Sequence, residues 1–237
     1  MMMFALSERA QDFIARTKAF IQQEIEPIEK TFWNEVHHRN VDGDWTKWQW
    51  PEQLQQLKDK AKAAGLWNMF LPDAELGAGL SVQEYAHIAE LTGRSLLAPT
   101  VFNCNAPDSG NMEVLWRYGS DEQKQRFLKP LAQGEMIGAF ALTEPHTGSD
   151  AAAIKTRAVK DGDDYILNGA KQFITSGDNA GVIIVFAVTD PSAGKKGISA
   201  FLVPRDTAGY EVIRVEEKLG LHASDTCQIA LTDVRIQ

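Results

Sequence analysis

The spacing of apolar residues changes once along this chain, at Gly134, and this change constrains the fold more than any other feature. Before Gly134, apolar side chains recur at helical spacing, as in a first predicted helix over residues 6–26 that Pro27 ends or kinks. After it, short apolar runs alternate with turn residues, a pattern typical of strands. We therefore predict an α+β fold, with an all-helical domain over residues 1–135 followed by a β domain over residues 136–237.

Start and stop signals divide the helical domain into several helices. Pro51 suits the first turn of a helix and Gly65 suits its C-terminal stop. Ser81 with Glu84 and Ser120 with Gln123 each have the spacing of a capping box. The further helices that we predict run over residues 51–64, 81–92, 108–118 and 120–129.

A tryptophan-rich patch interrupts this helical pattern. Because aromatic side chains bury a large area each, the patch predicts a loop that packs on the helical core. An aromatic box that faces a ligand stays open as the alternative. The four residues are Trp33, Trp45, Trp48 and Trp50.

We expect the β domain to be a small antiparallel barrel of about seven strands. The segments 161–163 and 168–169 have the composition of hairpin turns. Continuous apolar runs at 182–188 and 198–203 predict strands that are covered on both faces. The remaining strands are predicted at residues 137–142, 155–159, 165–168, 171–175 and 226–231.

Charge and composition exclude several classes of function. A net charge of -8 argues against a nucleic-acid partner, which requires a basic surface. Cys104 and Cys227 fit no metal or redox spacing, so we expect buried free thiols. No apolar run is long enough to span a bilayer and the N-terminus lacks a signal-peptide core, so we expect no membrane partner and a cytoplasmic location. The sequence also lacks the nicotinamide, nucleotide-hydrolase and zinc-protease motifs.

The segment FALTEPHTGSD, residues 140–150, predicts a strand that ends abruptly at a ligand. Pro145 has no amide hydrogen and should stop the pairing of the strand. Gly148 and Ser149 then form a tight polar turn. Backbone amides and hydroxyl groups at such a strand end suit a flat, acceptor-rich heterocycle that carries phosphates. An ordinary β-hairpin is the plain alternative.

This segment and the segment NGAKQFITSG, residues 168–177, together resemble the flavin-binding signature of the acyl-CoA dehydrogenase family. The resemblance extends from about Leu6 to the C-terminus and is most specific over residues 118–175. It implies an FAD-dependent oxidoreductase of fatty acid metabolism that dehydrogenates an acyl-CoA thioester between its α and β carbons. In that reaction a base removes the α-proton, a hydride moves to flavin N5, and the electrons pass to an electron-transfer flavoprotein.

The resemblance also assigns the residues that would hold FAD. The backbone of Leu142 and Thr143, with the Thr143 hydroxyl, would bind the pyrimidine end, and Thr175 would lie near N5. Ser149 would reach the pyrophosphate and the CoA thioester arm. Glu144 is not the base in this family. The full set of implied cofactor residues is Phe140, Leu142, Thr143, Gly148, Ser149, Phe173, Ile174 and Thr175.

A polar segment over residues 102–110 corresponds to the helical region that lines the acyl pocket in the family. A plain fatty acyl chain would need an apolar wall there. Asn105 therefore indicates either a hydroxylated or otherwise polar acyl group, or a polar loop that caps the next helix.

The family carries its catalytic Glu in a third, helical domain, and this chain stops at Gln237, about where that domain would begin. We therefore assign no catalytic residue, expect the chain alone to be inactive, and expect the complete protein to be a homo-oligomer. One alternative function is that of an acyl-CoA oxidase or flavin monooxygenase on the same scaffold. Another is that of a non-catalytic fragment that binds flavin or acyl-CoA.

Overall fold

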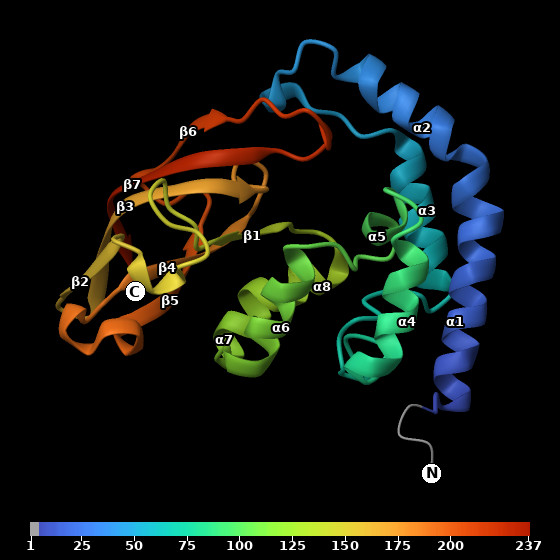
Figure 1. Cartoon of the computed structure of the whole chain (residues 1–237), viewed down its shortest axis with the longest axis horizontal. Coiled ribbons are helices and arrows are strands. Elements are labelled where there is room, and N and C mark those ends of the chain that lie inside the picture. The colour runs from blue at the N-terminus through green and yellow to red at the C-terminus, as the bar shows by residue number, and fades with distance from the viewer. Residues whose placement is uncertain (1–4) are drawn as a thin grey trace. The chain divides into compact units, whose positions relative to one another are not determined.

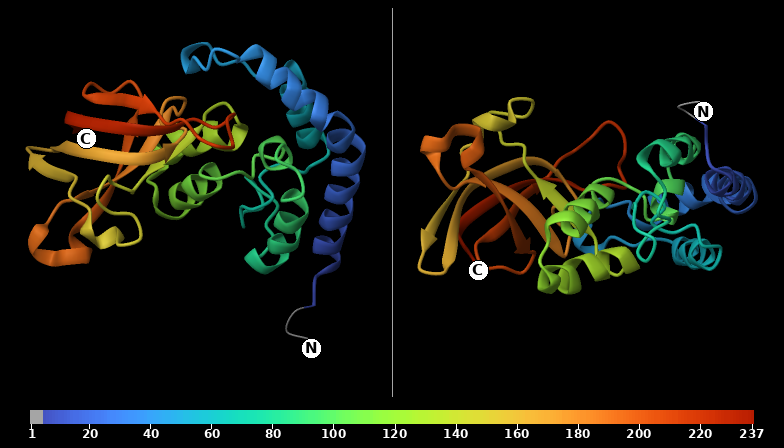
Figure 2. Two further views of the ribbon diagram at one scale, coloured as in Figure 1. Left: turned by 45° about the horizontal axis from the view of Figure 1, so that its top comes forward. Right: turned by 90° about the horizontal axis from the view of Figure 1, so that it is seen from below.

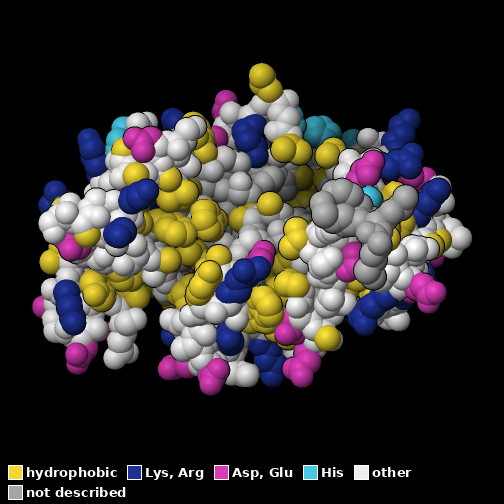
Figure 3. Space-filling model, turned by 60° about the horizontal axis from the view of Figure 1, so that its bottom comes forward, with side chains coloured by type: hydrophobic (Ala, Val, Ile, Leu, Met, Phe, Trp, Pro, Cys, Tyr) yellow, Lys and Arg dark blue, Asp and Glu magenta, His cyan; other side chains and the backbone are white. Residues whose placement is uncertain are grey.

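The computed structural model describes residues 5–237. The chain forms two compact units, Met1–Glu113 and Val114–Gln237 (Figure 1). The first unit is helical, and the second begins with helical turns and continues as a β-sheet, so the predicted order of a helical part before a β part is confirmed. None of the helices in residues 5–237 has the length and apolar character needed to cross a membrane. On the face shown in Figure 3, acidic and basic side chains lie interspersed among uncharged ones.

The predicted helices over residues 51–64, 81–92 and 108–118 agree closely with the structure. Ser81 and Glu84 form a complete capping box at the start of α4, and Ser120 and Gln123 form another before α7. Gly65, just beyond the end of α3, has a φ of 66°, as a helix-terminating glycine often does. The helices are α1 (Glu8–Phe20), α2 (Glu26–Arg39), α3 (Glu52–Ala63), α4 (Val82–Thr92), α5 (Ala98–Val101), α6 (Asp108–Tyr118), α7 (Asp121–Gln123) and α8 (Lys129–Gln133).

Two prolines lie inside continuous helical paths, and each follows a π-helical turn. The turn Ile21–Ile25 joins α1 to α2 ahead of Pro27, and the turn Lys124–Leu128 joins α7 to α8 ahead of Pro130. A π turn is wider than an α turn, which makes room for a ring that would otherwise meet the preceding carbonyl. Pro27 therefore does not end the first helical path, which continues to Arg39 (Figure 1).

The tryptophan patch is a set of rings in mutual contact. Trp45 and Trp48 stack with their centroids 4.3 Å apart, and Trp48 meets Trp50 edge-on. Trp33 packs edge-on against Phe32, which is buried in the helical core. These contacts anchor the segment between α2 and α3 on the core and agree with the prediction of a packed loop.

Seven strands form one curled sheet around an apolar core (Figures 1 and 2). The order along the sheet is β1-β4-β2-β3-β7-β6, and β5 pairs with β4. The core side chains come from both ends of this order, such as Ala139 of β1 and Tyr210 of β6, as well as from its middle, such as Leu167 of β3. The strands are β1 (Gly138–Ala141), β2 (Arg157–Asp161), β3 (Asp164–Thr175), β4 (Val182–Val188), β5 (Ile198–Pro204), β6 (Tyr210–Val215) and β7 (Thr226–Ile236).

The sheet is mixed, whereas the sequence predicted a purely antiparallel one. β1 pairs with β4 in parallel, from Gly138 opposite Val182 to Ala141 opposite Val185. β2 and β3 lie between β1 and β4 in the sequence, and so long a connection can bring the chain back in the same direction.

Residues 168–169 are not a turn, which corrects a second prediction. β3 runs through them without a break and carries a register shift between Leu167 and Gly169. A β-carbon on Gly169 would lie 2.4 Å from the Thr156 hydroxyl oxygen, so glycine is needed here for the close approach of two strands.

β1 and β2 share one edge of β4, since β5 occupies the whole of the other edge. β1 pairs with residues 182–185 of β4, and Arg157 of β2 pairs with Val188. The segment 142–156 therefore leaves the sheet at a split between β1 and β2. This split lies beside β3, and it positions the candidate site.

Candidate functional site

The two sequence motifs meet at the split in the sheet. The backbone amide of Gln172 in β3 donates to the carbonyl of Thr143 over 2.9 Å. One residue earlier, the Lys171 ammonium donates to the carbonyl of Leu142 over 3.1 Å. The segment after β1 is thus bonded to β3, so residues 140–150 and 168–177 lie side by side in the second unit.

A buried ion pair fills the split. Lys171 is 0% exposed and its Nζ lies 2.9 Å from Glu144 Oε1, while Glu144 is 4% exposed. The ammonium also donates to the Phe186 carbonyl of β4 over 2.7 Å. The carboxylate accepts from the amides of Lys155 (2.6 Å) and Thr156 (3.0 Å). Glu144 is therefore structurally paired and is not placed as a base.

The surroundings of this pair favour the charged carboxylate. Burial alone would raise the pKa of Glu144, but the donors of Thr156, Lys155 and Lys171 outweigh burial and lower that pKa below its ordinary value. For Lys171, burial lowers the pKa of the ammonium, and Glu144 offsets part of this effect.

A β-bulge in β3 turns Phe173 outward. Lys171 pairs with Ile229 and Ile174 pairs with Cys227, so Gln172 and Phe173 together face the single residue Gln228. Phe173 has a φ of 58°, which is uncommon for a bulky side chain, and 62% of its surface is exposed. The surrounding ladder holds this residue in a strained conformation that presents an aromatic ring to solvent, as happens at ligand sites.

A tight turn follows Thr175, and Asp225 holds it. Ser176 has a φ of 62°, and its amide donates to the Asp225 carbonyl over 3.1 Å. The Asp225 carboxylate accepts from the amide of Asp178 over 2.9 Å. Thr175 itself is half-buried at the end of β3, directly before this turn.

The loop after β1 is ordered by its own hydrogen bonds. Glu144 and Thr147 exchange backbone bonds of 2.9 and 3.1 Å. The Thr147 hydroxyl donates to the Asp150 carbonyl over 2.6 Å. The turn between them leaves Gly148 and Ser149 exposed.

The structure places the predicted cofactor residues in three environments. Phe140 packs on Phe186 with the ring centroids 4.9 Å apart, and Ile174 is buried in the core of the sheet. Leu142, Thr143 and Thr175 are half-buried, whereas Gly148, Ser149 and Phe173 are exposed. All eight belong to the unit Val114–Gln237.

This set fits FAD in its chemistry. The half-buried Thr143 and Thr175 bring hydroxyl groups, Phe173 brings an exposed aromatic ring for the flat ring system, and Ser149 lies on an open turn where phosphates can be reached. The structure narrows one prediction, namely which backbone atoms of Leu142 and Thr143 would contact the flavin. The Leu142 and Thr143 carbonyls accept bonds from within the protein, so the amide and hydroxyl donors at this corner are the stronger candidates for contact.

Asn105 lies in the other compact unit. It is half-buried, and its carbonyl accepts from the amide of Ser109 over 3.0 Å at the start of α6. This bond agrees with the interpretation of residues 102–110 as a segment that leads into a helix. The role of the Asn105 side chain toward an acyl group stays a prediction.

Sequence reasoning missed the residues that support the site. It assigned no role to Lys171, Asp225 or Tyr210, although Lys171 stands in a run of otherwise apolar or uncharged residues, which is a usable signal for a buried cation. Asp225 and Tyr210 act across strands, and nothing in their local sequence marks them.

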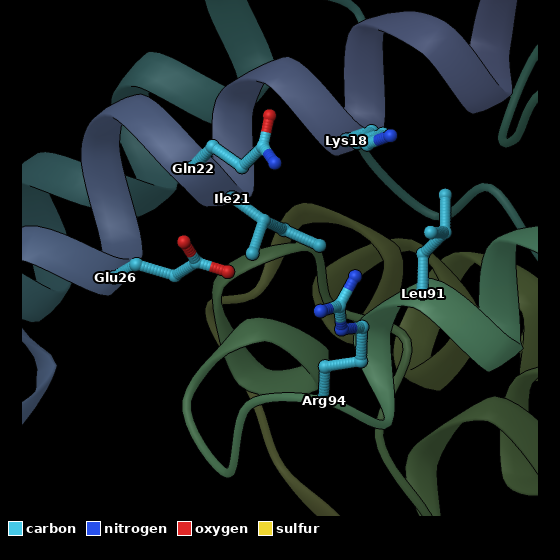
Figure 4. Close-up of a pocket in the computed structure, with 6 residues that line it drawn as sticks. All are labelled: Lys18, Ile21, Gln22, Glu26, Leu91 and Arg94. Atoms are coloured by element: carbon cyan, nitrogen blue, oxygen red, sulfur yellow. The ribbon is translucent and has the colours of Figure 1, made fainter.

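A shallow hollow in the helical unit lies apart from every predicted site residue. It is formed where the π turn after α1 faces the end of α4, and Figure 4 shows Arg94 and Glu26 on either side of the space next to Ile21. Lys18, Gln22 and Leu91 complete its lining.

Comparison with known proteins identifies the family of this chain. Residues 7–135 match the family described as acyl-CoA dehydrogenase, N-terminal domain, and residues 139–234 match acyl-CoA dehydrogenase, middle domain. The chain is 42% identical over 217 residues to acyl-CoA dehydrogenase family member 11 of Rattus norvegicus, which covers 90% of this chain and 27% of that protein.

Two solved structures have a similar fold. A candidate acyl-CoA dehydrogenase from Mycobacterium abscessus is 45% identical with a TM-score of 0.90, over 98% of this chain and 60% of that one. A glutaryl-CoA dehydrogenase from Mycobacterium smegmatis, solved in complex with FADH2, is 31% identical with a TM-score of 0.75, over 98% of this chain and 54% of that one. The chain thus spans from 27% to 60% of the length of these relatives. On these matches, which together span most of its length, the chain belongs to the acyl-CoA dehydrogenase family.

Proposed function

We propose that this chain holds FAD and part of an acyl-CoA for the α,β-dehydrogenation of an acyl thioester. The observation that carries the proposal is the joining of the two motifs, with Phe173 exposed on a strained bulge one residue from the Gln172–Thr143 bond. The relative from Mycobacterium smegmatis that was solved with FADH2 supports the choice of cofactor.

Different residues of the site would contact different parts of FAD. Thr143 and Thr175 would bond the flavin ring, Phe173 would pack on it, and Ser149 would contact the pyrophosphate and the CoA arm. When bound, FAD takes up the electrons released by oxidation of the acyl group. The protein contributes the position of the reacting groups, which supplies a large part of the rate in such reactions.

Proton removal from the α carbon requires a base within hydrogen-bond reach of it. Glu144 is not this base, because its two oxygens accept hydrogen bonds from Lys171, Lys155 and Thr156 inside the fold. We propose that the complete protein supplies this base from another segment and works as a homo-oligomer in the cytoplasm. We also propose that it passes electrons to an electron-transfer flavoprotein and takes part in fatty acid metabolism.

The test is titration of purified protein with FAD, followed by absorbance and by quenching of flavin fluorescence. We expect saturable binding with a shifted flavin spectrum. Phe173→Ala should weaken binding about tenfold, which corresponds to about 1.4 kcal/mol. Val159→Ala is the matched control, because Val159 is also 62% exposed but lies on β2 outside the motifs. Absence of binding, or equal effects of the two changes, would contradict the proposal.

A further inference from the structure

We propose that Lys171 is a positioning residue of the flavin site and acts through the peptide group between Leu142 and Thr143. Glu144 keeps Lys171 charged and in place. This inference rests on the proposed function, because it concerns how the corner at Thr143 is prepared for a flavin ring.

The bonding of Lys171 is complete. An ammonium group has three N–H donors, and Lys171 has three acceptors within hydrogen-bond distance: the carbonyls of Leu142 at 3.1 Å and Phe186 at 2.7 Å, and Glu144 Oε1 at 2.9 Å. The acceptors come from the end of β1, from the loop after it and from β4. A single cation therefore bonds the β1 side of the split to β4, and it reaches the β2 side through Glu144, which accepts from the Lys155 and Thr156 amides. Its Leu142 contact lies at the predicted flavin corner.

Stability alone is a weak explanation for this arrangement. Removing two charges from water is costly, and apolar residues of similar volume often replace a buried ion pair without loss of stability. The bond to Leu142 has a second consequence. The Leu142 carbonyl and the Thr143 amide belong to one peptide group, so a cation on the carbonyl polarises the amide and makes it a stronger donor.

The next peptide group, between Thr143 and Glu144, is fixed as well. The Gln172 amide holds the Thr143 carbonyl, so the peptide groups on both sides of the Thr143 α-carbon are bonded to β3. Thr143 thereby has a fixed backbone while its side chain stays half-buried. A donor held in this way needs no rearrangement when a ligand binds, which is the condition for electrostatic preorganisation.

The experiment replaces Lys171 with methionine, which has a similar length and no charge. We expect Lys171→Met to weaken FAD binding about tenfold, to shift the visible spectrum of the bound flavin and to lower its reduction potential. Lys58→Met is the matched control, because Lys58 is half-buried on α3 in the other compact unit and burial also lowers the pKa of its ammonium.

A second variant separates charge from folding. Lys171→Met leaves Glu144 buried without its partner, which could unfold the domain. The double variant Lys171→Met with Glu144→Gln removes both charges and keeps a side-chain oxygen that can accept from the Lys155 or Thr156 amide, so it should fold. If the double variant folds and matches wild type in FAD affinity, spectrum and potential, the inference is wrong, and the pair is only structural.

A measurement on the unaltered protein completes the test. The amide proton of Thr143 should shift in a nitrogen–proton correlation spectrum when FAD is added, and a shift confined to other residues would overturn the inference even if neither variant folds. Failure of the wild-type protein to bind FAD would instead overturn the proposed function. Wild-type binding that is indifferent to Lys171 would overturn this inference alone.

Discussion

The hydroxyl of Tyr210 donates a 2.7 Å hydrogen bond to the carbonyl of Gly177, and this bond ties strand β6 to the turn that follows Thr175. The turn is packed closely on β7, because a β-carbon on Gly177 would lie 2.7 Å from the β-carbon of Cys227. Burial raises the pKa of Tyr210, so its hydroxyl stays a donor. The end of β3 is thus held by strands that follow it by more than thirty residues.

We predict that Tyr210→Phe lowers the free energy of unfolding by about 1–2 kcal/mol, since it removes one buried hydrogen bond and leaves the Gly177 carbonyl without this donor. Urea unfolding followed by circular dichroism measures the change. Tyr118→Phe is the control, because Tyr118 is 79% exposed. Equal midpoints for the two variants would show that the Tyr210 bond does not stabilise the fold.

The two thiols should react slowly and at different rates. Burial raises the pKa of Cys227 to about 12, so roughly one molecule in ten thousand carries the reactive thiolate at pH 8. Cys227 is buried and Cys104 is half-buried, so Cys104 should react first. Labelling with a chromogenic disulfide reagent, applied to Cys104→Ser and Cys227→Ser, measures each rate. Fast labelling of Cys227 in folded protein would contradict its burial.

Acid should weaken the fold through Glu144. Its folded pKa is lowered below the ordinary value of 4.5, so its contribution is fully present above about pH 4.5 and is lost as the pH falls through the folded pKa. We predict that Glu144→Gln loses less stability than wild type between about pH 5 and pH 3. Glu217→Gln, at an exposed position, is the control. Parallel curves for wild type and Glu144→Gln would rule out this linkage.

The sequence predicted well those parts of the fold that depend on interactions between residues close together in the chain. The capping boxes at Ser81 and Ser120 fix helix starts with side chains three residues apart, and both are present. The interpretation of Asn168-Gly169 as a turn was wrong because that glycine serves a long-range contact with Thr156. Strand β6 was missed because a register shift between Val212 and Arg214 interrupts the alternation of polar and apolar residues along it.

In the candidate site, too, the sequence predicted features that depend on neighbouring residues and missed those that depend on long-range contacts. The motif residues could be identified from the order of residue types along the chain. The bulge at Phe173 could not, because it is a property of the register between β3 and β7. The burial of Lys171 likewise depends on three acceptors from separate segments, which only the folded chain brings together.

Thr175 gives a test of the flavin contacts themselves. Thr175→Val keeps the shape of the side chain and removes only its hydroxyl, whose bond near N5 should contribute about 1 kcal/mol to the reduced flavin. We predict that FAD is retained and that its reduction potential falls, measured by dye equilibration in the complete protein. Thr207→Val, at a half-buried position outside the motifs, should leave the potential unchanged. An unchanged potential in Thr175→Val would place that hydroxyl away from N5.

The polypeptide of residues 1–237 should bind FAD and still fail to reduce it. Glu144, the carboxylate within the flavin motif, is 4% exposed and accepts three hydrogen bonds from within the fold, so its oxygens are buried and engaged inside the protein. We therefore expect the oxidised flavin band to persist when FAD-loaded protein is mixed with a panel of acyl-CoA thioesters without oxygen. Rapid bleaching that survives Glu144→Gln would reveal another base within these residues. Bleaching that Glu144→Gln abolishes would show that the ion pair with Lys171 opens during the reaction and that Glu144 is the base.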